Sequence, residues 1–265
     1  MFFLYGIHID DLAKEQVELL LEQWLNSQRG YAIFTPNPEF ILAARTHKTF
    51  HTLLNQSHLS LPDGIGLTYA AAALTDNRLH HRQTGVDTLL LLAELCQKHH
   101  KRLLLLGGMD GVAYQAAQQL NKQFPRLEAV GIDPGYLPGD DQSVSIPSEL
   151  FDEIQKEQPD VIAVALGQGK QERVCLDLLE RFPWVRIAIG VGGALDTLSG
   201  RLTRAPQWMR TAGFEWLWRL IIQPRRWKRI MKATIVFPLV VLSDTIKQRR
   251  FLRACRHVFK EFFIR

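Results

Sequence analysis

The feature that most constrains the fold is a regular alternation of short apolar segments with longer amphipathic ones over the first 200 residues. Two of the short segments, LLLL at 103–106 and VIAVAL at 161–166, are apolar throughout. Strands of a parallel sheet have this character because helices cover both of their faces. Strands that alternate with helices of about 10–15 residues indicate βαβ units. The sequence therefore predicts an α/β fold with a mainly parallel sheet and flanking helices.

The same pattern places the individual elements. Strands are predicted at 31–34, 59–61, 102–106, 127–132, 161–166 and 185–189. Helices are predicted at 11–28, 38–55, 65–74, 86–99, 111–123, 148–157 and 171–181. From residue 201 the pattern changes to basic helices that Pro224 interrupts. We therefore expect an α/β domain over residues 1–200 and a basic amphipathic helical appendage over residues 201–265.

Charge divides the chain at the same place. Residues 201–265 carry sixteen Lys and Arg against three acids, a net charge of +13, whereas residues 1–200 carry sixteen against twenty-four, a net charge of −8. A basic end on an acidic body indicates an anionic partner, which could be a lipid surface, a nucleic acid or a phosphorylated substrate. The apolar run at 233–242 is ten residues long and contains Pro238. A spanning helix needs about 20 such residues, so we expect no membrane crossing.

Composition and cysteine spacing exclude several classes of protein. With 265 residues, 46% hydrophobic and 22% charged, the chain is neither disordered nor a small disulfide-stapled scaffold. Its three cysteines are far apart, which fits a reducing cytosol better than a disulfide framework or a structural zinc site. Four of the nine histidines form two adjacent pairs, His80-His81 and His99-His100, a spacing that does not suit two ligands of one metal, so no metal site is predicted. The N-terminus lacks the basic region and cleavage site of a signal peptide.

Glycines, amides and carboxylates follow five of the predicted strands. The segments are TPNPE (35–39), PDGIG (62–66), GGMDG (107–111), GQGKQE (167–172) and GVGG (190–193), with Asp196 soon after the last. Open α/β sheets bind ligands at the carboxyl ends of their strands. Turns alone would explain one or two such segments, so five together favour a ligand site at this edge.

Each of these segments also has a purely structural interpretation. Gly107 and Gly108 could cradle a phosphate with backbone N–H groups, or could simply allow tight strand–helix packing. Neither glycine turn that could hold phosphate fits the dinucleotide fingerprint, and no P-loop sequence is present, so a nucleotide-binding oxidoreductase of Rossmann type is only the alternative. Asp63 could cap the following helix or act as a general base, and Thr35 and Asn37 have the same ambiguity.

The basic appendage contains candidate phosphate ligands. Arg219, Arg226 and Arg229 are spaced by seven and three residues, which would place them on one face of a helix that Pro224 bends. The planar guanidinium group suits paired phosphate oxygens. Four tryptophans between residues 208 and 227 argue against a merely solvated surface and against nucleic-acid binding, because Trp favours membrane interfaces.

Taken in order, short motifs of this chain resemble the WecG/TagA/CpsF family of bacterial glycosyltransferases, which is glycosyltransferase family 26. The motifs are TPNPE (35–39), PDGIG (62–66), RQTGVD (82–87), LLGG (105–108), GY (135–136), ALGQGKQE (165–172), GVGGALD (190–196), RAPQW (204–208) and FEWLWRL…QPRR (214–226). The resemblance covers residues 5 to 232 and implies a Rossmann-like fold of the GT-E type. One departure is Gly169, where the family pattern has proline.

The resemblance implies an inverting, metal-independent and cofactor-free transfer of N-acetylmannosamine, its uronate or a related hexose from a UDP-sugar donor. The acceptor would be a polyprenyl-diphosphate-linked sugar of cell-wall or surface polysaccharide synthesis. The enzyme would be peripheral on the cytoplasmic face of the cell membrane, bound to its anionic surface. A homo-oligomer is compatible with the resemblance, and no nucleic-acid partner is expected.

The resemblance also assigns roles to individual residues. Asp63 becomes the catalytic base that deprotonates the acceptor hydroxyl. Residues that would line the donor and acceptor pocket are Thr35, Asn37, Arg82, Gly107, Gly108, Gln171 and Glu172. Tyr136 and Asp196 would hold the nucleoside. Arg219, Arg226 and Arg229 would close over the site and meet the diphosphate.

Overall fold

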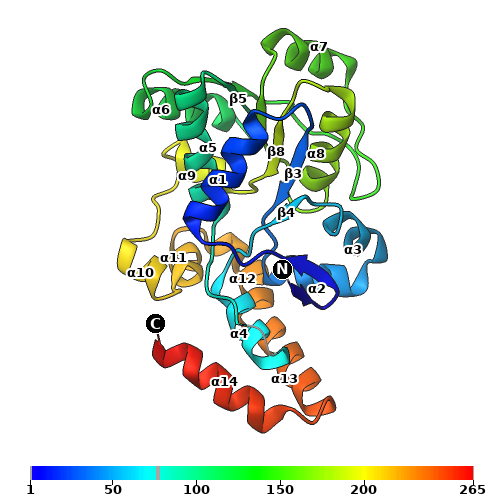
Figure 1. Ribbon diagram of the computed structural model, residues 1–265, viewed down its shortest axis with the longest axis vertical. Helices are drawn as coiled ribbons and strands as arrows, with labels where there is room; N and C mark the ends of the chain where they lie inside the picture. Colours follow the sequence, from blue (N-terminus) through cyan, green and yellow to red (C-terminus); the bar gives the residue numbers. More distant parts are fainter. Residues whose placement is uncertain (1, 76–77, 265) are drawn as a thin grey trace.

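In the computed structural model, which describes residues 2–75 and 78–264, six parallel strands form one sheet between two layers of helices (Figure 1). The strands are β3 (Tyr31–Phe34), β4 (Leu59–Ser60), β5 (Arg102–Gly107), β6 (Glu128–Ile132), β7 (Val161–Ala165) and β8 (Ile187–Gly190). Their order across the sheet is β4-β3-β8-β7-β5-β6. The predicted α/β fold and its six strands are confirmed.

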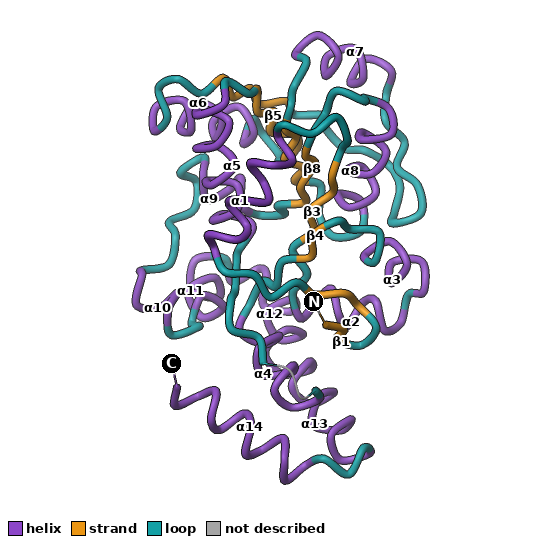
Figure 2. The backbone as a smooth tube through the Cα atoms, viewed as in Figure 1, coloured by secondary structure: helices purple, strands orange, loops and turns teal. Residues whose placement is uncertain are grey.

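The sheet separates two hydrophobic cores, and the side chains of one strand alternate between them. Leu104 and Leu106 of β5 enter one core, while Leu103 and Leu105 enter the other. Helices on the second face are α1 (Lys14–Leu25), α5 (Gly85–His99), α6 (Val112–Gln123) and α9 (Ala194–Leu198). Helices on the first are α2 (Pro38–Thr46), α3 (Lys48–Leu54), α7 (Ser148–Glu157) and α8 (Lys170–Arg181) (Figure 2). Continuous apolar runs are therefore explained by burial on both faces.

Two differences from the predicted elements concern the N-terminal part. The single helix predicted at 38–55 is two helices, because the backbone at His47 is extended, with φ −118° and ψ 102°. A hairpin of β1 (Phe2–Leu4) and β2 (Ile7–Ile9) was not predicted, because strands of three residues are too short to show alternation. Asp10 ties this hairpin to β4 by donating to the Ser60 carbonyl at 2.8 Å and accepting from the Ser60 N–H at 2.9 Å.

The C-terminal quarter is a chain of helical segments rather than two long helices. They are α10 (Gln207–Thr211), α11 (Glu215–Ile222), the 3-10 turn η1 (Pro224–Arg226), α12 (Trp227–Met231), the π-helical turn η2 (Lys232–Val236), α13 (Phe237–Lys247) and α14 (Phe251–Ile264). Because Pro224 lacks an N–H and keeps the preceding residue, Gln223, out of the helical conformation (φ −133°, ψ 66°), α11 ends before it. The prediction that Arg219, Arg226 and Arg229 share one helix face is therefore wrong, since they lie in α11, η1 and α12.

The last two helices pack on α4 (Ile65–Leu74), the helix that follows β4. Phe237 of α13 is fully buried, and it lies so close to α4 that a Cβ at Gly66 would be 3.7 Å from its ring. Arg250, between α13 and α14, donates to the Leu74 carbonyl at 2.8 Å, and Glu261 of α14 pairs with Arg78. Residues beyond 232 are thus joined to the α/β body through α4.

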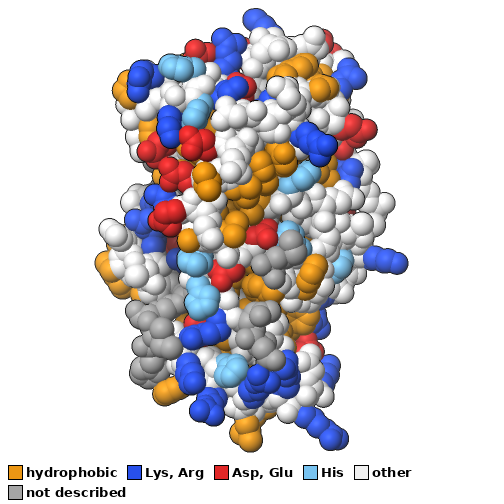
Figure 3. All heavy atoms as spheres, in the orientation of Figure 1, with side chains coloured by type: hydrophobic (Ala, Val, Ile, Leu, Met, Phe, Trp, Pro, Cys, Tyr) orange, Lys and Arg blue, Asp and Glu red, His pale blue; other side chains and the backbone are white. Residues whose placement is uncertain are grey.

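The surface of this end of the molecule is basic and partly apolar. Lys and Arg side chains gather at the lower end of the face in Figure 3, where Figure 1 places α13 and α14. Large exposed apolar side chains occur on the same two helices, at Leu239, Leu242, Ile246, Phe251, Leu252 and Phe259. Among the helices of the described residues, none is both long enough and apolar enough to span a bilayer.

Candidate active site at the carboxyl edge of the sheet

Loops from separate parts of the sequence meet at the carboxyl edge of β3, β4 and β8. The Thr35 hydroxyl, after β3, donates to the Gly190 carbonyl at the end of β8 at 3.2 Å. The Asp63 N–H, after β4, donates to the Pro36 carbonyl at 2.9 Å. Gly85 at the start of α5 approaches Val191, so that a Cβ there would be 3.4 Å from the Val191 carbonyl oxygen. Four of the predicted motifs therefore converge on one place.

Asp63 does not cap α4. The residue at the N-cap position is Gly64, with φ +92° and no side-chain cap, so the helix-cap interpretation is wrong. No other described residue donates a hydrogen bond to the Asp63 carboxylate. Burial raises the pKa of Asp63 to about 6; Arg219 and then Arg82 lower it, while the charge of Glu215 raises it. A carboxylate that is free to accept a proton near neutral pH has the properties of a general base.

Asn37 has a structural role at the start of a helix. The Asn37 side chain caps α2, since its Oδ1 accepts from the N–H groups of Glu39 at 2.9 Å and Phe40 at 3.2 Å. Its Nδ2 group makes no hydrogen bond with another residue that the structure describes. The cap interpretation is thus confirmed for the oxygen of Asn37, and the amide nitrogen is available to a ligand.

Packing accounts for the glycines after β5. Gly107 and Gly108 have φ values of +105° and +74°. A Cβ at Gly107 would lie 2.5 Å from the Ala165 carbonyl oxygen, and one at Gly108 would lie 2.8 Å from the Val112 Cβ. The Gly108 N–H already donates to Ala165 at 3.1 Å. Close packing against β7 therefore explains Gly107, packing against α6 explains Gly108, and the N–H of Gly108 is not free for phosphate.

Gln171 and Glu172 lie behind the edge rather than on its open surface. Both side chains are buried, Glu172 completely. Glu172 accepts from the Gly169 N–H at 2.7 Å and from Gln171 Nε2 at 2.6 Å, and Gln171 Oε1 accepts from the Gly192 N–H at 3.0 Å. Burial raises the pKa of Glu172 to about 7, although these hydrogen bonds favour its ionised form.

The basic segments bring two of the predicted arginines into ion pairs across the same edge. Arg226 Nη2 lies 3.4 Å from Asp196 Oδ2, and Arg229 Nη2 lies 2.9 Å from Glu39 Oε2. Burial and the neighbouring charge of Arg229 lower the pKa of Arg226. Arg219 is exposed on α11. These three residues are thus gathered from separate elements and not by one helical face.

Arg82 and Tyr136 make contacts with two different elements. Arg82 donates to the Arg210 carbonyl at 2.7 Å and lies 3.6 Å from Glu215, so it joins the start of α5 to the basic segments. Tyr136 is 83% exposed. The Lys170 Nζ atom lies 4.6 Å from the centre of the Tyr136 ring, so the ring is held beside the start of α8.

The model of a protein family described as "Glycosyl transferase WecG/TagA/CpsF family" matches residues 2–251 of this chain. The chain belongs to this family. It is 32% identical to an N-acetylglucosaminyldiphosphoundecaprenol N-acetyl-beta-D-mannosaminyltransferase of Bacillus subtilis, over 89% of this chain and 88% of the relative. A protein with the same name in Bacillus spizizenii is 30% identical, over 84% of this chain and 83% of the relative. One in Staphylococcus aureus is 29% identical, over 88% of this chain and 89% of the relative. As a WecG/TagA/CpsF protein, the chain is a glycosyltransferase.

Several residues of this WecG/TagA/CpsF site were not singled out from the sequence. Glu39 and Glu215 are the carboxylate partners of Arg229 and Arg82, and Arg204 pairs with Asp87, which accepts from the Thr84 hydroxyl at 2.6 Å. All three acids belong to the short motifs quoted for the resemblance, and that membership is the signal that could have found them. Among the described residues, no group of three or more His, Cys, Asp or Glu side chains could hold a metal ion.

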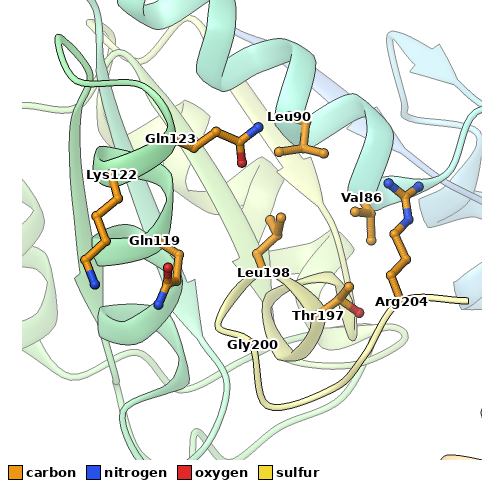
Figure 4. Close-up of a pocket in the computed structure, with 9 residues that line it drawn as sticks. All are labelled: Val86, Leu90, Gln119, Lys122, Gln123, Thr197, Leu198, Gly200 and Arg204. Carbon is orange, nitrogen blue, oxygen red and sulfur yellow. The ribbon is translucent and has the colours of Figure 1, made fainter.

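A surface groove of about 600 Å³ lies beside this site, between α5, α6 and α9 (Figure 4), and Arg204 belongs to both. Val86, Leu90 and Leu198 form its apolar part, while Lys122 and Arg204 stand at its sides. None of the predicted site residues lines this groove. The candidate active site is therefore defined by the convergence of loops around Asp63.

Proposed function

We propose that this glycosyltransferase moves N-acetylmannosamine, its uronate or a related hexose from a UDP donor to a polyprenyl-diphosphate-linked sugar of cell-wall or surface polysaccharide synthesis. The activity for which the relatives are named supports the class of acceptor and of transferred sugar. The observation that carries the proposal is Asp63, a desolvated carboxylate without a hydrogen-bond donor among the described residues, beside the charge of Arg219.

Asp63 would act on the acceptor. Its pKa of about 6 leaves it ionised at neutral pH, and yet basic enough to take a proton from a hydroxyl that is becoming a nucleophile. As the acceptor oxygen bonds to the anomeric carbon, the bond from that carbon to the UDP oxygen breaks, and the hydroxyl proton passes to Asp63. Attack opposite the leaving group inverts the anomeric centre.

The arginines would act on the leaving group. Departure of UDP concentrates negative charge on the diphosphate, and fixed cations stabilise that charge in the transition state. Arg229 and Arg219 lie near enough to Arg226 for their charges to lower its pKa. Binding of the diphosphate would exchange the present partners of Arg226 and Arg229 for phosphate oxygens. We propose this metal-independent stabilisation in place of a bound cation.

The remaining predicted residues would hold the substrates. The free amide nitrogen of Asn37 and the guanidinium group of Arg82 would meet sugar hydroxyls, with Thr35 at the junction of β3 and β8. The exposed ring of Tyr136 would stack on the nucleoside, and Asp196 would accept from it.

We also place the enzyme peripherally on the cytoplasmic face of the membrane. The exposed apolar side chains of α13 and α14 stand among Lys and Arg side chains, which is the composition of a helix that lies in a lipid interface. Each basic residue near an anionic surface contributes about 1 kcal/mol. In this proposal residues 201–265 bring the α/β body to its lipid-linked acceptor.

The test is UDP release by the purified protein on liposomes. A panel of UDP-sugars is offered with a polyprenyl-diphosphate-N-acetylglucosamine analogue, with and without EDTA. Acceptor-dependent release that survives EDTA is expected, and the donor that supports it names the sugar. If folded, lipid-bound protein neither releases UDP nor binds UDP in calorimetry, the proposal is overturned.

A further inference from the structure

A chain of three hydrogen bonds beneath the carboxyl edge joins the glycine turns that follow β7 and β8. At one end the Gly192 N–H donates to Gln171 Oε1 at 3.0 Å. In the middle Gln171 Nε2 donates to Glu172 Oε1 at 2.6 Å, and at the other end the Gly169 N–H donates to Glu172 Oε2 at 2.7 Å. Glu172 is fully buried and Gln171 nearly so, which means that water cannot replace a partner that the Glu172 carboxylate loses.

These three hydrogen bonds can form with only one arrangement of donors and acceptors. Both of its ends are backbone N–H groups, which can only donate. Gln171 supplies one acceptor and one donor, so Glu172 must supply two acceptors, as an ionised carboxylate does. With an amide at position 172, the amide NH2 group would face another donor, either the Gly169 N–H or Gln171 Nε2. The carboxylate therefore fixes which way the Gln171 amide points, with its oxygen toward Gly192.

The same pair supports the turn that contacts Thr35. A Cβ at Gly190 would lie 3.0 Å from both Gln171 Nε2 and Glu172 Oε1, so the two side chains pack directly against the end of β8. The Gly190 carbonyl accepts from the Thr35 hydroxyl, and Gly192 has a left-handed φ of +50° that its hydrogen bond to Gln171 helps to hold. The position of the turn and the orientation of the Gln171 amide are thus linked.

We propose that Glu172 is a positioning residue which does not touch substrate, and which orients Gln171 so that the 190–193 turn is held against Thr35 in the geometry needed for transfer. The kinetic part of this inference rests on the proposed function, whereas its structural part does not. It replaces the sequence-based expectation that Glu172 lines the substrate pocket.

The test compares three variants at pH 8, where the carboxylate is ionised. Glu172→Gln puts a donor in place of one acceptor. The double variant Gln171→Glu with Glu172→Gln reverses the order of amide and carboxylate, and again satisfies both terminal N–H groups. Glu180→Gln changes an exposed acid of the same helix and serves as the control. Amide hydrogen exchange is followed over residues 187–198 by mass spectrometry, and kcat and KM are measured for the donor sugar.

We expect Glu172→Gln to speed exchange in the 190–193 turn by about tenfold or more, as the loss of one buried hydrogen bond would, and to lower kcat more than it changes KM. The double variant should regain the exchange protection and part of kcat. Unchanged exchange in Glu172→Gln, with or without loss of turnover, overturns the proposal, and so does a double variant that stays unprotected. If the wild-type protein has no transferase activity, the proposed function fails while the exchange measurements still decide the structural part.

Discussion

Two nitrogen atoms of Arg229 donate hydrogen bonds to the carboxylate of Glu39. Its Nε lies 3.1 Å and its Nη2 2.9 Å from Glu39 Oε2, and this pair joins α12 to the first turn of α2. Glu39 is two residues beyond Asn37, which caps the same helix. A basic segment from the end of the chain is thereby fixed beside the loop that approaches Asp63. A diphosphate that binds here has to compete with a carboxylate already in place.

Replacement of Asp63 tests the base. We expect Asp63→Asn to lower kcat by a factor of about 10²–10⁴, the usual contribution of a general base. The fold should persist, because this carboxylate accepts no hydrogen bond from a described residue and is desolvated by burial. UDP release and thermal melts followed by circular dichroism measure both effects. Asp152→Asn, an exposed acid of α7, is the control, and equal activity in the two variants would contradict the role of Asp63.

The pH dependence of kcat/KM should show an acidic limb at about 6. Burial raises the pKa of Asp63 from 3.8 to about 6, so the base becomes protonated, and the rate falls, as the pH drops through that value. Arg219 is the charge that lowers this pKa most, so Arg219→Gln should move the limb to higher pH. Rates measured between pH 5 and 9 report the shift independently of any loss in kcat. A limb that stays in place would show that Arg219 does not act on Asp63.

Arg226 should matter more than its neighbour Arg225. Arg226 is partly buried and paired with Asp196, whereas Arg225 is exposed. Loss of a charged hydrogen bond to the diphosphate is worth about 1.5–3 kcal/mol, so we expect Arg226→Ala to lower kcat/KM by about tenfold or more. Arg225→Ala should leave it nearly unchanged. Steady-state kinetics with varied UDP-sugar provides the comparison, and similar losses in both variants would indicate a general effect of charge.

Lipid binding should depend on the apolar side chains of α14. Leu252 and Phe259 are 83% and 64% exposed. Transfer of one such side chain out of water is worth about 1.5–3 kcal/mol, so the double variant Leu252→Asp with Phe259→Asp should bind anionic liposomes at least about tenfold less tightly. Sedimentation with phosphatidylglycerol vesicles measures the binding. Leu19→Asp, an exposed position on α1, is the control, and equal binding by both proteins would exclude α14 from the lipid contact.

Phe237 tests how firmly α13 is joined to the body. Its ring is fully buried against α4, whereas Leu239, two residues later, is exposed. A buried Phe→Ala change costs about 3–5 kcal/mol of unfolding free energy, so Phe237→Ala should be strongly destabilising in urea titrations. Leu239→Ala should change stability by less than about 0.5 kcal/mol, as is usual at the surface. A small effect of Phe237→Ala would mean that α13 contributes little to the stability of the body.

The sequence predicted the sheet well because its strands are buried on both faces. Runs such as 103–106 and 161–166 have no polar interruption, and their ends are marked by glycine or by acidic residues. The β1–β2 hairpin was not predicted, because strands of three residues are too short to show an alternation of apolar and polar side chains. The basic quarter was less predictable, because Pro224 and the glycine at 213 divide it into short segments. Their positions depend on packing against α2 and α4 and on the ion pair of Arg226 with Asp196 of α9.

Prediction of the site was strongest for its location and weakest for individual side chains. Motifs at strand ends must meet at one edge of a parallel sheet, which brought Thr35, Asp63 and Gly190 together. Burial, however, depends on tertiary packing. The Asp63 carboxylate has no hydrogen-bond donor among the described residues, whereas both carboxylate oxygens of Glu172 accept hydrogen bonds. No spacing rule distinguishes two acids in similar glycine-rich turns.

The hydroxyl groups of Thr68 and Tyr69 are the polar side-chain groups of the otherwise apolar helix α4, which has alanines at 70–73 and α13 and α14 lying against it. A protein truncated before Phe237 would leave that surface in water, next to the loop of Asp63. Such a shortened form should self-associate and lose solubility, whatever its affinity for lipid. The C-terminal helices are therefore a cover for the α/β body as well as an extension of it, and shortened versions of this enzyme should be designed with α13 retained.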